Sequence, residues 1–378
     1  MDHPGAESGR RPVRRSILKA GLGAAAASVV GGQLTATPAH AVPSADYPWI
    51  IDCDSWGARP PGGDVSLSGT ATNKIIWHHM AFPNVTDYSR EQAIKLAQDC
   101  QNLHMDGNGW LDTGQHFTVS RGGYVLEGRH RSLEELSGGK PQVIAAHCPG
   151  ENGRAIGIEN EGTYVTETPP HALRKSLVKL SVAICREYGL AAHDIFGHWD
   201  ARDTLCPGAA FYAQFPMLRR MVRKALGTRM SAIPRRRWPD TWRFVGGPVV
   251  QVAQYLLNGQ GYALAVDGAF GTATVAAVQD WQAKNGIPVD VDATLTTPTW
   301  ETLVPYLRAG ATGPAVNALQ LMLTRKGFLA TASAVYDDAT VTAVRGLQRL
   351  HGLDRTGKAD KSTWCAAVGG IVRESFDD

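Results

Sequence analysis

Residues 196–208 read FGHWDARDTLCPG. His198 stands eight residues before Cys206, and Pro-Gly follows that cysteine directly. Imidazole nitrogens and thiolates are good zinc ligands, and a catalytic zinc site combines three protein ligands with one open position. This stretch makes His198 and Cys206 candidates for such a site, although a lone histidine is more often an ordinary core or surface residue.

A second histidine stands out because it ends an apolar run. Residues 74–79 read KIIWHH. An apolar run of this length, rich in β-branched residues, is typical of a short buried strand. His78 is therefore, with His198, a histidine whose sequence context makes it a candidate functional residue.

The surrounding residues alternate between helix and strand signals. Residues 89–92 read SREQ, a capping box that predicts the start of a helix. Residues 116–128 alternate around a Gly-Gly pair, which predicts a hairpin. Residues 155–159 predict another short strand, and residues 173–188 predict a long amphipathic helix. Strands interleaved with helices predict an α/β domain over residues 42–226.

The last third of the chain contains an internal repeat. Gly247-Pro248 returns as Gly313-Pro314, and a set of apolar residues, a glutamine and a glycine returns at the same offset of 66 residues. Each copy is predicted to form a small three-helix module, over residues 247–308 and 313–372. Neither copy contains a cluster of His, Asp and Glu, which indicates a binding element.

Residues 227–246 separate the two halves. They contain Pro234, Pro239 and three consecutive arginines, 235–237, with little hydrophobic periodicity. A basic run of this kind is typical of a solvated tether. Contact of the arginines with anionic wall polymers is the alternative that the sequence leaves open.

The N-terminus has the order of an export signal. Residues 14–19 read RRSILK, an apolar run of small residues follows, and Ala39-His40-Ala41 fits a cleavage site. The adjacent arginines favour the twin-arginine type, which exports folded proteins. We expect residues 1–41 to be removed and the protein to be secreted or located in the cell wall.

Charge and hydropathy exclude two kinds of partner. Of 38 Lys and Arg and 35 Asp and Glu residues, the first 41 residues contain five and two, which leaves 33 of each sign. A near-neutral body argues against nucleic-acid binding, which depends on phosphate neutralisation. No stretch reaches the ~18 apolar residues of a spanning helix, so we expect no membrane span. We also expect no oligomer.

Cysteine usage depends on the compartment. An exported protein can form disulfides. If Cys206 is a metal ligand, four other cysteines in the same half could form two bridges, in pairings that the sequence does not determine, and Cys365 stands alone. The six cysteines are Cys53, Cys100, Cys148, Cys185, Cys206 and Cys365.

The first domain resembles the zinc-dependent N-acetylmuramoyl-L-alanine amidases of the type 2 family, which includes phage lytic amidases and animal peptidoglycan recognition proteins. The resemblance implies a mixed central sheet flanked by helices, a zinc cofactor and peptidoglycan as the partner. The C-terminal copies resemble the small helical peptidoglycan-binding domain, and the second copy departs from it at residues 336–338. The amidase motifs occur in the family's order at residues 55–60, 75–79, 109–117, 146–147, 155–159 and 198–208.

By position in these motifs, the resemblance implies that His78, His198 and Cys206 hold the zinc. His79 directly follows a ligand. Because neighbouring strand residues point to opposite faces, we expect His79 to be structural.

One position departs from the family. Many members carry a tyrosine near the zinc where this chain has Gln115, which cannot transfer a proton. We place Gln115 among the substrate-binding residues. A second branch of the family uses a glutamate that matches Glu159, and a carboxylate there is a suitable general base. Glu161 is the fallback candidate, and a purely structural role for Glu159 is the alternative.

Two further site residues follow from the resemblance. Thr204 stands two residues before the last ligand, where members carry Lys or Thr, and its hydroxyl could donate to a developing oxyanion. His147 matches a histidine that lines the site and could hold the stem peptide or the oxyanion. We therefore assign Glu159 and Thr204 catalytic roles, and His147 and Gln115 roles in substrate binding.

The sequence thus predicts a zinc amidase that cleaves the bond between N-acetylmuramic acid and L-alanine while its C-terminal modules anchor it to the wall. The alternative is a non-catalytic peptidoglycan receptor on the same fold, which Gln115 favours. A third interpretation, a Cys-His peptidase using Cys148 or Cys100, lacks a recognisable nucleophile motif.

Overall fold

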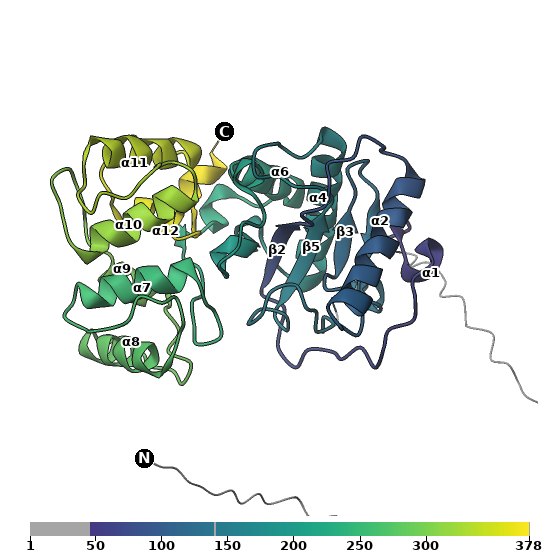
Figure 1. Ribbon diagram of the computed structural model, residues 1–378, viewed down its shortest axis with the longest axis horizontal. Helices are drawn as coiled ribbons and strands as arrows, with labels where there is room; N and C mark the ends of the chain where they lie inside the picture. Colours follow the sequence, from purple (N-terminus) through teal and green to yellow (C-terminus); the bar gives the residue numbers. More distant parts are fainter. Residues whose placement is uncertain (1–45, 140, 378) are drawn as a thin grey trace, which may run out of the picture. The chain divides into compact units, whose positions relative to one another are not determined.

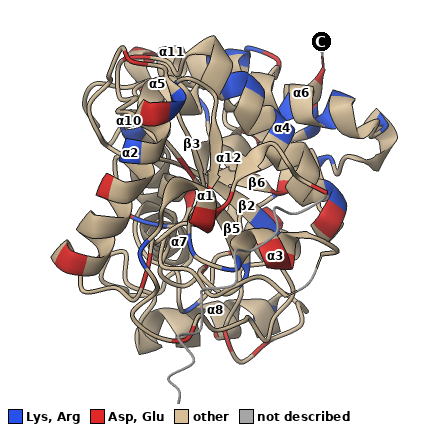
Figure 2. Ribbon diagram, turned by 90° about the vertical axis from the view of Figure 1, so that its right-hand side faces the viewer, with Lys and Arg blue, Asp and Glu red and all other residues tan. Residues whose placement is uncertain are grey.

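The computed structural model describes residues 46–139 and 141–377. The signal expected over residues 1–41 lies outside the described residues. No helix within the described ranges combines the length and hydropathy needed to cross a membrane. Acidic and basic residues are interspersed over the helices in Figure 2, as the charge balance of the sequence indicates.

A six-stranded mixed sheet forms the centre of the first domain. Strands β3 and β4 make the antiparallel hairpin expected over residues 116–128, and the other neighbours pair in parallel. This confirms the predicted mixed sheet. Across the sheet the strands are β1 (Ile50–Ile51), β4 (Val125–Glu127), β3 (Phe117–Val119), β5 (Ala155–Asn160), β2 (Lys74–His79) and β6 (Ile195–Gly197).

Helices cover both faces of this sheet (Figure 1). Ser89 caps α2 (Arg90–Asn102) by accepting a hydrogen bond from the Gln92 amide, as the capping box predicts. Helix α2 packs with α1 on the face that carries Leu126 of β4. The opposite face packs against α4 and α6. The helices of this domain are α1 (Cys53–Trp56), α2, α3 (Ser132–Leu136), α4 (His171–Tyr188), α5 (Ala209–Tyr212) and α6 (Phe215–Leu226).

Strand β2 divides its side chains between two environments. Ile75 and Trp77 enter the large core that α4 and α6 cover, where the Trp77 ring stacks on Phe211. Ile76 and His78 point to the opposite face, because successive strand residues alternate. The register places Glu159 of β5 beside His78 on that face. Sheet pairing thus brings a histidine and a carboxylate together.

The C-terminal third folds into the two predicted three-helix modules. Equivalent glutamines, Gln282 and Gln348, are buried and donate to the loop before the third helix, from Nε2 to the Thr294 and Lys358 carbonyl oxygens. In each module, the repeated glutamine therefore connects the second helix to the following loop by a hydrogen bond. The modules comprise α7 (Pro248–Asn258), α8 (Thr272–Lys284) and α9 (Thr297–Leu303), then α10 (Pro314–Arg325), α11 (Asp338–Leu350) and α12 (Lys361–Ala367).

The segment expected to be a solvated tether is folded against both halves, so that prediction is wrong. Arg237 contacts both Asp194 and Asp240, at 3.6 and 3.1 Å. Trp238 is buried and stacks on Trp300 of the first module. Strand β7 (Arg236–Arg237) pairs with β8 (Ile371–Val372) near the C-terminus. Asp194 lies 43 positions from Arg237, so local composition does not reveal this partner.

The cysteines do not form the bridges considered above. All six are free and buried. Cys53, for example, donates to the Gly128 carbonyl oxygen and packs with α2. Buried thiols of this kind behave as small apolar core residues.

His351, directly after α11, is a histidine whose burial is not compensated by hydrogen bonds within the described residues. Its side chain is 1% exposed, and neither ring nitrogen has a hydrogen-bond partner in residues 46–139 and 141–377. Burial, aided by the nearby Lys326 and Arg219 cations, lowers its pKa from 6.5 to about 3. The folded protein therefore holds this ring neutral at a cost in stability.

We expect His351→Leu to raise the free energy of unfolding by about 1 kcal/mol near neutral pH, because it removes an unsatisfied buried polar group. As pH falls below 6.5, the unfolded chain binds a proton at His351 that the folded chain excludes, so the wild type loses stability that the variant keeps. Urea unfolding at about pH 7.5 and about pH 5 measures both effects.

The exposed His171 at the start of α4 supplies the control. His171→Leu removes no buried polar group, so it should not raise the free energy of unfolding near neutral pH. A His351→Leu protein that unfolds like the wild type at both pH values would contradict the assignment.

Candidate functional site

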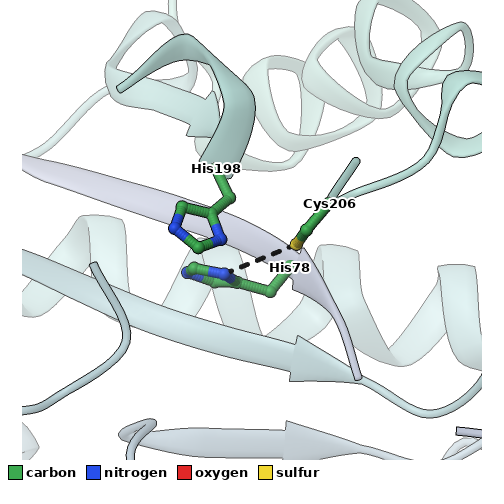
Figure 3. A group of neighbouring side chains, drawn as sticks. All are labelled: His78, His198 and Cys206. Carbon is green, nitrogen blue, oxygen red and sulfur yellow. Dashed lines mark hydrogen bonds between the residues drawn. The ribbon is translucent and has the colours of Figure 1, made fainter. Parts of the chain in front are cut away.

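Three side chains from distant parts of the chain converge at the end of β2 (Figure 3). Strands β2 and β6 are parallel neighbours with Trp77 opposite Gly197, so the residues that follow each, His78 and His198, emerge side by side. Cys206 reaches the same place from the loop after His198. The ligand atoms of these three residues all lie within 4.8 Å of one another.

The geometry and chemistry of this group fit a zinc ion. A tetrahedral zinc with one nitrogen and one sulfur ligand places those atoms about 3.5 Å apart. The His78 Nδ1 and Cys206 Sγ atoms are 3.6 Å apart. Burial lowers the pKa of His198 to about 4, which leaves the neutral ring that a metal requires, and raises the pKa of the Cys206 thiol. A cation at this point would favour loss of the thiol proton.

His147 lies against the ligand candidate His78. Its Nε2 is 3.1 Å from the Ala155 carbonyl oxygen, and its Nδ1 is 2.9 Å from His78 Nε2. A carbonyl oxygen only accepts, so His147 Nε2 carries a hydrogen and the neutral ring accepts at Nδ1. His78 therefore donates from Nε2 and keeps its Nδ1 lone pair free toward Cys206 and Glu159.

Close packing under His147 explains the glycine of the IGIE motif. A Cβ atom on Gly157 would stand 2.4 Å from His147 Cγ. No side chain fits there without moving the ring, so the glycine permits the hydrogen bond between the two histidines. Because both nitrogens of His147 are engaged, its surroundings differ from the substrate-lining position expected for it.

Glu159 is the carboxylate closest to the ligands in the register of the sheet. Its Oε1 atom is 3.7 Å from His78 Nδ1. Its Oε2 atom is buried and has no hydrogen-bond partner within the described part of the chain. The side chain is 17% exposed, and burial raises its pKa to about 8. A buried carboxylate oxygen without a partner, beside a ligand group, can accept a proton from a molecule that enters the site.

Gln115 is turned into the sheet face. Its amide Nε2 donates to Thr118 Oγ1 at 2.9 Å and also contacts the Cys100 sulfur. Thr118 pairs with Glu159 in the register of β3 and β5. Gln115 therefore belongs to the packing around Glu159, and its side chain is almost fully buried.

Thr204 lies next to the last ligand. Its Oγ1 accepts a hydrogen bond from the Cys206 amide at 3.1 Å, which orients the loop and leaves the hydroxyl hydrogen available for donation. Glu161, the fallback base, accepts at Oε2 from the Arg121 amide and at Oε1 from Gln92, a structural role. His79 accepts from the Tyr164 amide at Nδ1.

Sequence reasoning missed Asp200. Its Oδ2 accepts from the Gly197 amide and its Oδ1 accepts from the Tyr212 hydroxyl, both at 2.8 Å. Asp200 thereby fixes the turn that carries His198. It stood within the quoted motif, two residues after the ligand, and the only available signal was an acidic residue next to a ligand.

The peptidase interpretation has no support from the thiols that it needs. Cys100 and Cys148 are buried, and burial raises the pKa of each to about 12. A nucleophilic cysteine needs a lowered pKa and access to solvent.

Comparison with known proteins agrees with this site. A family described as "N-acetylmuramoyl-L-alanine amidase" matches residues 68–209, which include the three ligand candidates and Glu159. A second family, described as "Putative peptidoglycan binding domain", matches residues 246–303 and 312–366.

Three curated relatives illustrate the similarity, and all three are animal proteins. Peptidoglycan-recognition protein LB of Drosophila melanogaster is 31% identical over 44% of this chain and 66% of its own length. Peptidoglycan-recognition protein SC2 of the same organism is 31% identical, over 42% of this chain and 80% of its own length. Peptidoglycan recognition protein 1 of Bos indicus is 34% identical, over 46% and 86%. Each match covers less than half of this chain.

Among solved structures, wild-type Drosophila PGRP-LB is 30% identical and covers 44% of this chain and 91% of its own, with a TM-score of 0.38. The amidase LysC from Clostridium intestinale is 25% identical, over 44% and 95%, with a TM-score of 0.35. The sequence relationships over most of the length of SC2 and of the bovine protein, together with the two family matches, confirm the resemblance. The chain belongs to the family of N-acetylmuramoyl-L-alanine amidases and peptidoglycan recognition proteins, and it carries two peptidoglycan-binding domains after that domain.

Proposed function

We propose that this protein is a zinc-dependent hydrolase of the amide bond between N-acetylmuramic acid and L-alanine in peptidoglycan. The observation that carries the proposal is the unpartnered Glu159 carboxylate next to the converged His78, His198 and Cys206. Zinc on these three residues would polarise the scissile carbonyl and make a water molecule more acidic.

The chain's own groups supply the proton transfers. Glu159 takes a proton at Oε2 from the attacking water and returns it to the amide nitrogen as the amine of L-alanine leaves. Thr204 donates its hydroxyl hydrogen toward the oxygen that becomes negative. The Gln115 amide is neither an acid nor a base near neutral pH, and it donates to Thr118. We therefore assign Gln115 a structural role next to Glu159 rather than a role in a chemical step.

His147 acts by positioning His78. Its acceptor Nδ1 fixes the His78 tautomer, so that Nδ1 of His78 is the nitrogen available to the metal. Partners of this kind orient metal-binding histidines and raise metal affinity.

We further propose that residues 1–41 direct export by the twin-arginine route and that the enzyme acts at the cell wall. Export after folding suits a protein whose six cysteines are free and buried in a packed core, since such thiols need no oxidising compartment.

A recognition protein that binds without cleaving is the second candidate. Gln115 favours it because the position carries no proton donor. Three of the named relatives are recognition proteins, which keeps this alternative open.

Incubation of the chain from Val42 onward with purified peptidoglycan separates the two candidates. We expect release of new N-terminal alanine, and its loss when a zinc chelator is added. Binding to the wall without alanine release, by protein shown to contain zinc, would establish the recognition function instead.

Glu159→Gln should lower the rate of alanine release by about 100-fold or more, because the general base is lost. Zinc content should stay the same, since Glu159 is not a ligand. Glu167→Gln, an exposed residue of the same region, serves as the matched control and should retain the wild-type rate. A near-normal rate in Glu159→Gln would exclude Glu159 as the base.

His147→Phe should raise the dissociation constant for zinc by about 10- to 100-fold, because His78 loses the partner that fixes its tautomer. Competition with a chelating dye measures the constant. His147→Gln can keep one hydrogen bond, so its dissociation constant for zinc should lie between those of His147→Phe and the wild type. His193→Phe, a half-buried histidine outside the site, is the control, and an equal effect there would refute the positioning role.

A further inference from the structure

The end of helix α10, in the second module, contacts the loop that carries two of the ligand candidates. Lys326 Nζ donates to the Tyr212 hydroxyl oxygen at 3.0 Å and lies 3.9 Å from Asp200 Oδ1. Arg325 pairs with Asp203 at 2.9 Å and donates to the Thr204 carbonyl oxygen at 3.2 Å. Two consecutive basic residues thus hold both ends of the segment between His198 and Cys206.

A continuous set of hydrogen bonds leads from Lys326 to His198. Tyr212 accepts from Lys326 and donates to Asp200, and Asp200 accepts from the Gly197 amide, directly before His198. Without Lys326, the buried Asp200 carboxylate would lose a nearby positive charge. Asp200 fixes the turn that orients His198, so this loss would affect the position of His198.

Burial makes these contacts strong. The side chains of Lys326 and Asp200 are only 3% and 2% exposed. The Lys326 ammonium also lies 4.1 Å from the centroid of the Tyr212 ring. A lysine is rarely buried to this degree unless it is paired, and removal of one partner from such a pair leaves an uncompensated buried charge.

The first module also approaches this loop, since Gly247 has a φ of +93° and a Cβ atom there would stand 2.5 Å from the Asp203 amide nitrogen, but it lacks the basic pair. At the 66-residue offset, Gly259 and Gln260 occupy the places of Arg325 and Lys326, and both are exposed. The second module also approaches Asp200 with Gly369, whose φ is +91° and where a Cβ atom would stand 2.2 Å from Asp200 Oδ1. Two separate points of the second module are therefore shaped to the metal-ligand loop.

We propose that the second module is a structural brace of the metal site, in which Lys326 and Arg325 are positioning residues that keep His198 and Cys206 in ligating geometry. Zinc retention by the first domain then depends on the second module. The inference rests on the metal site of the proposed function but not on turnover.

The test measures how fast the full chain, loaded with zinc, releases the ion to excess chelator. Lys326→Met should release zinc at least 10-fold faster than the wild type, and Arg325→Ala, which removes the more exposed contact, about 3-fold faster. Lys284→Met makes the same substitution at an exposed lysine of the first module and should release zinc at the wild-type rate.

Thermal unfolding of each apo variant identifies any general loss of folding. If Lys326→Met is unfolded, a milder set of variants decides. Arg325→Ala and the Arg325→Ala/Asp203→Ala double variant should release zinc equally fast, because Arg325→Ala already removes the ion pair with Asp203. Asp203→Ala alone should release zinc faster than the wild type but no faster than Arg325→Ala, because Arg325 then keeps its hydrogen bond to the Thr204 carbonyl oxygen. Folded variants that all release zinc at the wild-type rate would overturn the brace while leaving the amidase proposal intact. A wild type that holds no zinc would overturn both.

Discussion

The pairing of β2 between β5 and β6 is the constraint on which the candidate site depends. Its register puts His78 beside Glu159 and lets His198 follow β6 next to His78. A slip by one residue would send every β2 side chain to the other face and place His79 where His78 stands. Trp77 secures the register from the opposite face, where its ring packs on Phe215 and its indole nitrogen donates to Ser181.

Burial then determines what this arrangement can do. His78, His147 and His116 are buried together, and burial lowers the pKa of each, so the cluster is neutral. Both ring nitrogens of His147 and of His116 are engaged in hydrogen bonds, which leaves Nδ1 of His78 as the nitrogen directed toward Cys206 and Glu159. Burial also raises the pKa of Glu159 and of Cys206. A divalent cation compensates both effects at once, because it needs neutral imidazoles and stabilises anionic oxygen and sulfur. This balance of charge is the reason that a divalent cation is the occupant we propose for the site.

The features that have a local sequence pattern were predicted correctly. The apolar run before His78, the capping box at Ser89 and the 66-residue repeat each have a period or a spacing, and the structure contains the corresponding strand, helix cap and paired modules. Local context singled out the three ligand candidates, the family resemblance assigned them to one zinc site, and the structure brings their ligand atoms together.

What sequence reasoning missed depends on partners far apart in the chain. His147 meets His78 across 69 positions, and Lys326 meets Tyr212 across 114. No period links such residues, so the hydrogen bond between His147 and His78 was not predicted. The arginine run at 235–237 failed in the same way, since its acidic partner Glu301 lies 65 positions from Arg236.

The divergence of the two modules bears on how the protein can hold a polymer. A flexible tether raises local concentration by an amount that depends on its length, but residues 227–246 and the second module are packed against the first domain. With packed modules, two binding elements help each other only if the polymer fits their fixed spacing. In the second module, Arg325 and Lys326 form hydrogen bonds to the first domain. The corresponding residues of the first module, Gly259 and Gln260, are exposed. The two copies thus differ at this position: the first has an exposed surface there, and the second contacts the segment that carries the ligand candidates His198 and Cys206.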